Sequence, residues 1–136
     1  MQNCSVNGAI SLDVRTEKSH GGSVYLGGMI AENYANISSC KADQITLSLN
    51  HQDASQAAED TALSVNVGGL SASNTSTINC DVNAVIEVSV EKPVGEAVVA
   101  VGGLAGSQYY MTAEKNNVQT EIQMNNKLDA EKGIER

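Results

Sequence analysis

The four residues VGGL occur twice in this chain, and a near copy occurs a third time. The two full copies are residues 67–70 and 101–104, and LGGM occupies residues 26–29. Alternating apolar residues precede each copy, a period of two that is typical of a β-strand. Glycine permits a sharp bend and close backbone approach, so we expect the chain to turn a corner at each pair. The corner glycines are Gly27, Gly28, Gly68, Gly69, Gly102 and Gly103.

Two further motifs recur in the same order. A cysteine motif lies near the N-terminus and again about ten positions after the first two glycine pairs, and an alternating strand pattern follows each cysteine. One repeat therefore contains three short strands: one before the glycines, one at the cysteine and one after it. The ladders of stacked residues that we expect are Leu26/Val67/Val101, Cys4/Cys40/Cys80 and Ile10/Ile45/Ile86/Val118.

Repetition of like residues at like positions favours a right-handed parallel β-solenoid with three short strands per coil. In such a fold, equivalent strands stack along the axis, so each inner position recurs once per coil. The pattern predicts between three and four coils over residues 1–126, with residues 127–136 as a polar tail or cap. The competing interpretation is an antiparallel β-sandwich of short strands, which would not require the same residues to recur in order.

Composition limits both the core and the partners. The 136 residues include no Phe, no Trp and four Tyr, which predicts a narrow core of aliphatic side chains. A net charge of −8, with scattered Lys and Arg, argues against nucleic acid as a partner. No run of about 18 apolar residues is present, so we expect no membrane insertion.

The repeat also carries a family resemblance. Residues 67–70 with Asn79 and Cys80, together with residues 101–106, resemble the GLUG-type repeats of bacterial surface proteins. Residues 26–29 with Cys40 form a looser copy. The resemblance implies a β-helical segment of an extracellular or cell-surface adhesin, and it implies no catalytic residues.

The three cysteines occupy equivalent places in the repeat. Cys4, Cys40 and Cys80 form no CxxC pair and have no paired histidines at zinc-ligand spacing. We expect them to be a structural ladder of small apolar thiols. One disulfide between stacked neighbours and a metal site are the alternatives.

Acidic residues and both histidines gather where we expect loops to stack along one edge, over residues 15–22, 50–62 and 91–97. This edge is a solvated acidic surface, a weak Ca²⁺ site or the location of a catalytic carboxylate pair. We expect no other cofactor and no resident metal. The residues concerned are Glu17, His20, His51, Asp53, Glu59, Asp60, Glu91 and Glu96.

The sequence therefore predicts a non-enzymatic extracellular module with a structural or adhesive role. A surface glycan or protein of a host would be its partner. One alternative is a filament subunit that associates end to end through open solenoid ends. A further alternative is a β-helix that binds glycans or acts on polysaccharides.

Overall fold

The computed structural model describes residues 1–16, 22–53, 62–92, 96–128 and 133–135. This part of the chain consists of thirteen β-strands and no helix. The strands form three sheets, named sheets 1, 2 and 3.

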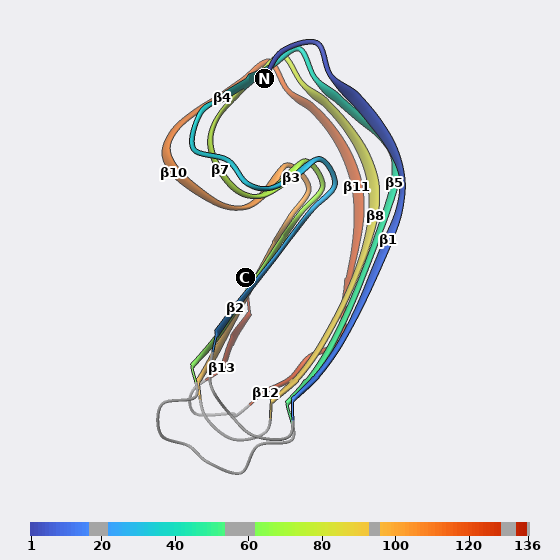
Figure 1. Ribbon diagram of the computed structural model, residues 1–136, viewed down its shortest axis with the longest axis vertical. Helices are drawn as coiled ribbons and strands as arrows, with labels where there is room; N and C mark the ends of the chain where they lie inside the picture. The colour runs from blue at the N-terminus through green and yellow to red at the C-terminus, as the bar shows by residue number, and fades with distance from the viewer. Residues whose placement is uncertain (17–21, 54–61, 93–95, 129–132, 136) are drawn as a thin grey trace.

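Sheet 1 holds the longest strands and forms one long curved wall (Figure 1). Sheet 2 is straighter and faces the lower half of sheet 1, whereas sheet 3 curls over the upper half. Sheet 1 contains β1 (Ser5–Thr16), β5 (Lys41–Asp53), β8 (Asp81–Lys92), β11 (Asn117–Met124) and β12 (Lys127–Leu128). Sheet 2 contains β2 (Gly22–Gly27), β6 (Leu63–Gly68), β9 (Ala97–Gly102) and β13 (Gly133–Glu135). Sheet 3 contains β3 (Ile30–Glu32), β4 (Asn36–Ser38), β7 (Ser71–Ile78) and β10 (Ala105–Glu114).

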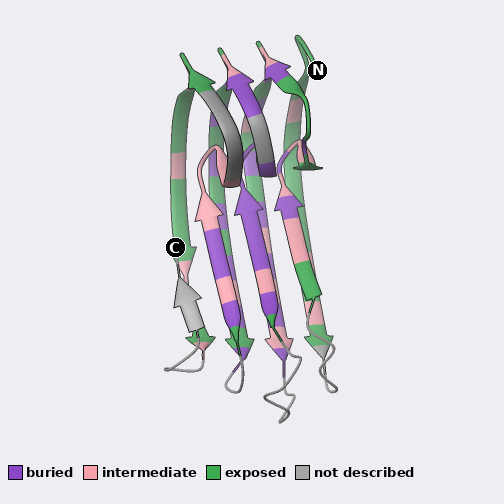
Figure 2. Ribbon diagram, turned by 90° about the vertical axis from the view of Figure 1, so that its left-hand side faces the viewer, coloured by how far each residue is buried: buried purple, intermediate pink, exposed green. Residues whose placement is uncertain are grey.

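Every pairing between these strands is parallel. The chain passes through sheets 1, 2 and 3 in this order and then returns to sheet 1. One such passage is called a repeat below, and successive repeats lie side by side (Figure 2). The antiparallel sandwich is therefore wrong, because its strands would pair in opposite directions. The tail from residue 127 adds β12 to sheet 1 and β13 to sheet 2.

The core is aliphatic and lies between the sheets. Alternate residues of β5 and β8 point inward, and all of these inward residues are buried. Leu47 and Ile86 of sheet 1 face the same core as Val65 and Val67 of sheet 2, all of them completely buried. Burying one such side chain contributes about 1.5–3 kcal/mol, so stacked ladders provide the main stabilising term.

The glycine pairs lie at the corner between sheets 2 and 3. A Cβ atom at Gly68 would lie 1.8 Å from the carbonyl oxygen of Ser71, because the chain reverses within three residues. A Cβ atom at Gly69 would lie 2.1 Å from the carbonyl oxygen of Gly103 in the next repeat. The first glycine is thus required by the turn, and the second by the close approach of neighbouring repeats.

The cysteine motif is also a corner, which corrects the expectation of a strand centred on it. Ser39 and Asn79 adopt left-handed backbone conformations, with φ of 53° and 55°, which end β4 and β7. Cys40 and Cys80 follow at the turn, outside any strand. The third strand of each repeat lies before the cysteine, in sheet 3. A single left-handed residue bends the chain at this point. The apolar pattern of the sequence continues across it, so the sequence alone predicted a strand there.

One predicted ladder is confirmed and another is wrong. Leu26, Val67 and Val101 are register partners, as expected. The sheet 1 ladder instead joins Ile10, Leu47, Ile86 and Ile122. Part of the difference comes from one extra residue in β5, where the register shifts between Ala42 and Ile45 and Gln44 has a φ of 53°. This bulge shifts the rest of β5 by one residue, so Ile45 pairs with Ala84 and Leu47 with Ile86. In β11, Val118 pairs with Val82 and not with Ile86.

We predict that Gly68→Ala destabilises the protein by about 3 kcal/mol, because the new methyl group must displace backbone atoms of the turn. Urea unfolding monitored by circular dichroism measures this change. Asn83→Ala is the control, since Asn83 is exposed on β8 and its truncation should cost less than about 0.5 kcal/mol. Equal unfolding midpoints for the two variants would contradict the proposed role of the corner.

Candidate functional site

The structure separates the residues of the predicted acidic edge. Glu17, His20, Glu59 and Asp60 lie outside the described residues. His51 and Asp53 belong to β5 and not to a loop, and both are buried. Glu91 is exposed on β8, on the opposite face of sheet 1, and Glu96 is exposed just before β9. The described members therefore share no single surface, because alternate strand residues point to opposite faces.

A buried polar cluster lies at the lower end of sheet 1. The ammonium group of Lys92 donates a hydrogen bond to Asp53 Oδ2 over 3.0 Å. Lys92 is completely buried, and the Asp53 side chain is 5% exposed. In-register pairing places Gln52 beside Glu91 and therefore Asp53 beside Lys92. The pair is shielded from solvent. In this buried position, either charge without its partner would be strongly destabilising.

His51 lies two residues before Asp53 on the same inward face and is 4% exposed. Its Nδ1 atom has no hydrogen-bond partner within the described structure. Burial lowers the pKa of His51 below its usual value of 6.5; Asp53 opposes this shift and Lys92 adds to it. The imidazole is therefore neutral at neutral pH.

Sequence reasoning named His51 and Asp53 but missed Lys92. The available signal was the period of two: Val88, Val90 and Lys92 continue one inward series on β8. Leu49, His51 and Asp53 continue the equivalent series on β5. We expected the strands to end before these polar residues, because Lys and Asp rarely occupy buried positions.

The three cysteines make the same side-chain contact at their corners. The thiols of Cys4, Cys40 and Cys80 each lie 3.4 Å from the carbonyl oxygen two residues earlier. All three cysteines are free; Cys4 is exposed and the other two are buried. Burial raises the pKa of Cys80, so its thiol stays protonated and weakly reactive.

Asn116 occupies the cysteine position in the last repeat, directly after the left-handed residue Lys115. Its Oδ1 atom accepts a hydrogen bond from the Cys80 amide over 2.9 Å, and its Nδ2 atom donates to the Thr77 carbonyl over 3.0 Å. An amide side chain can bridge both backbone groups, whereas a thiol is a weak donor and acceptor.

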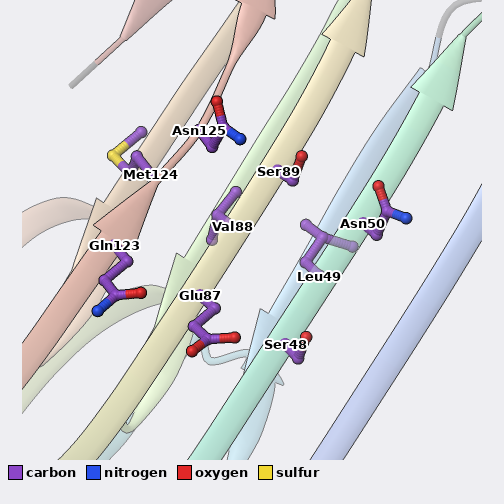
Figure 3. A pocket seen from close by; sticks show the side chains of 9 residues that line it. All are labelled: Ser48, Leu49, Asn50, Glu87, Val88, Ser89, Gln123, Met124 and Asn125. Carbon is purple, nitrogen blue, oxygen red and sulfur yellow. The ribbon is translucent and has the colours of Figure 1, made fainter.

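The outer face of sheet 1 carries a shallow hollow of about 390 Å³ across β5, β8 and the end of β11 (Figure 3). Figure 3 shows its polar side chains in two rows across the strands, one with Ser48, Glu87 and Gln123 and the other with Asn50, Ser89 and Asn125. Hydroxyl and amide groups there can exchange hydrogen bonds with a polar ligand. Its lining residues are Ser48, Leu49, Asn50, Glu87, Val88, Ser89, Gln123, Met124 and Asn125.

Comparisons with known proteins add no identification. No protein-family model matches the chain, and no curated protein or solved structure matches it significantly. Among the described residues, no helix is long and apolar enough to cross a membrane. The same residues contain no cluster of three His, Cys, Asp or Glu side chains arranged to hold a metal ion.

We predict that Asp53→Ala costs about 3–5 kcal/mol of stability, because it leaves the Lys92 ammonium buried without its carboxylate. Adding Lys92→Met removes the unpaired charge and should recover most of that loss. A double-mutant cycle from denaturant unfolding measures the coupling between the two positions. Additive effects of the two substitutions would show that the ion pair does not contribute as a unit.

We also predict that stability falls as pH drops below 6.5. The unfolded chain then binds a proton at His51 that the buried imidazole resists. The free energy of unfolding should decrease by up to about 1.4 kcal/mol per pH unit while the folded imidazole stays neutral. Urea unfolding between about pH 8 and pH 5 tests this dependence, which remains above the onset of most carboxylate titration.

His51→Val is the informative comparison, because Val14 and Val90 occupy the same ladder position in neighbouring repeats. This variant should lose the dependence between about pH 6.5 and pH 5. Retention of the full pH dependence in His51→Val would assign it to other groups.

Proposed function

We propose that the chain forms a right-handed parallel β-solenoid with three strands per coil and between three and four coils. The constant order of sheets 1, 2 and 3 supports this architecture, as does the recurrence of the same corners in each repeat. The right hand follows from the strong preference of parallel crossover connections. The resemblance to GLUG-type repeats agrees with it.

We further propose that this solenoid is a non-enzymatic structural or adhesive module of an extracellular bacterial surface protein. The observation that carries the proposal is the division of chemistry between the faces of sheet 1. Its inward ladders are almost entirely aliphatic, whereas its outward positions on β5 and β8 are mostly polar or charged, with Val85 as an exposed aliphatic exception. Such a wall provides a rigid body with one broad polar surface.

The location of the titratable groups supports a role without catalysis. His51, Asp53 and Lys92 form a group of ionisable side chains that is buried among aliphatic residues. A general acid or base must reach the proton that it transfers, so these three groups are not available to an external substrate. Their contribution is to packing and stability.

The hollow on the outer face of sheet 1 is the adhesive surface in this proposal. Its hydroxyl and amide groups suit the hydroxyls of a surface glycan or the backbone of a host protein. The negative charge of the chain, −8 overall, would exclude strongly acidic polymers. The same binding experiment tests two alternatives. A Ca²⁺ site at the acidic edge would make binding depend on Ca²⁺, and the glycan-binding alternative would give binding to the immobilised glycans.

The adhesive function is tested with immobilised glycans and extracellular-matrix proteins, in buffer with Ca²⁺ and with a chelator. We predict that Ser48→Trp weakens the observed binding at least about tenfold, because the indole fills the hollow. Thr46→Trp is the matched control: Thr46 is exposed, and it lies two residues away on the same face of β5, outside the hollow. Equal binding of both variants, or no binding of the unmodified chain to any immobilised molecule, would contradict an adhesive hollow.

A further inference from the structure

The first and last strands of sheet 1 expose residues that the inner strands bury. Ile10 of β1 is 41% exposed, and Ile122 of β11 is 38% exposed. Their ladder partners Leu47 and Ile86 are completely buried. Val118 of β11 is likewise 39% exposed. Each end of the stack thus presents a slice through the aliphatic core instead of a polar cover.

Hydrogen bonds at the glycine corner all run in one direction. The amide of Gly28 donates to Gly68, and the amide of Gly69 donates to Gly102. The amides of Met29 and Ile30 both donate to Leu70, and those of Leu70 and Ser71 both donate to Leu104. An earlier repeat therefore always donates to a later one. The glycine corner occurs three times, whereas sheet 1 stacks four strands, so the described structure has no glycine corner at the level of β11.

The cysteine corner follows two further rules. Each left-handed residue donates to the following repeat: Asn3 to Ser38, Ser39 to Ile78 and Asn79 to Glu114. One position after each cysteine the direction reverses, since Lys41 donates to Cys4 and Asp81 to Cys40. The fourth left-handed residue, Lys115, thus offers an amide at the last repeat, where Asn116 offers a carbonyl. The first repeat offers the matching carbonyl of Gln2 and amide of Ser5.

We propose that a second copy of this chain stacks its β1 edge on the β11 edge of the first, head to tail and in parallel register. This inference rests on the proposed solenoid architecture. The cysteine corner then continues across the junction: the Lys115 amide faces the Gln2 carbonyl of the second copy, and the Asn116 carbonyl faces its Ser5 amide. The contact is heterologous and does not close, so it propagates into a filament.

The inner ladders match across the same junction. Continuing the observed register by one repeat places Val118 beside Val6, Ile122 beside Ile10 and Met124 beside Leu12 of the second copy. All three are contacts between aliphatic or thioether side chains of similar size, which removes the exposed core slices from water. Repulsion opposes these contacts, because Lys127 lies beside Arg15 of the second copy and both copies carry a net negative charge. Association should therefore strengthen as added salt screens these charges.

Size-exclusion chromatography with light scattering over a hundredfold concentration range tests the association of the full chain. We expect the average mass to rise from 14.2 kDa to multiples of it, with rods visible in negative-stain images. Val118→Lys with Ile122→Lys places charges on the inward face of β11 and should abolish the growth. Gln119→Lys with Gln123→Lys adds the same charge to exposed outward positions of that strand and should preserve it.

Circular dichroism of each variant separates lost association from lost folding. A folded β-rich protein that stays at 14.2 kDa throughout would overturn the stacking while leaving the solenoid proposal standing. An unfolded unmodified chain would overturn both. Equal growth of the inward and outward lysine variants would show that another surface mediates association.

Cross-linking tests the direction and register without changing the core. Ser11 and Gln123 are exposed and outward, and they occupy the same ladder through Ser48 and Glu87. In a Cys4→Ser background, Ser11→Cys combined with Gln123→Cys should yield a series of disulfide-linked oligomers under mild oxidation, and each substitution alone should yield no such series. Dimers from Ser11→Cys alone would indicate head-to-head pairing and overturn the proposal, as would monomers from the double variant.

Discussion

In-register hydrogen bonding between parallel repeats is the constraint on which the other features depend. When each residue of a repeat pairs with its equivalent in the next, every inner position becomes a column along the stack. A column tolerates only side chains of similar size and polarity, since a mismatch leaves a void or an unpaired group in the core. This explains why the chain repeats aliphatic residues at fixed positions and manages without Phe or Trp. It also means that a change at one position affects the repeats on both sides.

The corners make that register possible. Repeats can stack in register only when each one turns at the equivalent residue. Two kinds of corner achieve this by different means. The glycine corner uses the absence of a side chain, because neighbouring repeats approach too closely for a Cβ atom. The cysteine corner uses a left-handed residue, and its four occupants are Asn3, Ser39, Asn79 and Lys115. Asn79 Nδ2 also donates to Ser39 Oγ over 3.2 Å, which links two of these corners through their side chains.

The lower end of sheet 1 departs from the aliphatic pattern of the other columns, because His51, Asp53 and Lys92 place polar groups on the inward face. A buried ion pair adds little net stability relative to a well-packed apolar pair, but separating its members is costly. The pair therefore penalises any slip of β5 against β8, since a shift of even one residue would separate the ammonium from the carboxylate. We interpret the cluster as a device that secures register at the end of two long strands.

The sequence by itself determined the strand content, the repeat, the corner glycines and the ladder through Leu26, Val67 and Val101, because alternation and glycine pairs are local signals. It did not reveal the left-handed residue before each cysteine or the bulge at Gln44, since one is a backbone torsion and the other a single extra residue, and neither changes the local apolar pattern enough to be recognised. The left-handed residues decided where the strands of sheets 3 and 1 end and begin, and the bulge shifted the partner of Ile10 by one residue, from Thr46 to Leu47. The acidic edge was inferred from residues near one another along the chain, whereas burial depends on the face to which each side chain points. Only the tertiary structure could therefore place His51 and Asp53 inside, leave Glu91 outside and bring Lys92 within hydrogen-bonding distance of Asp53.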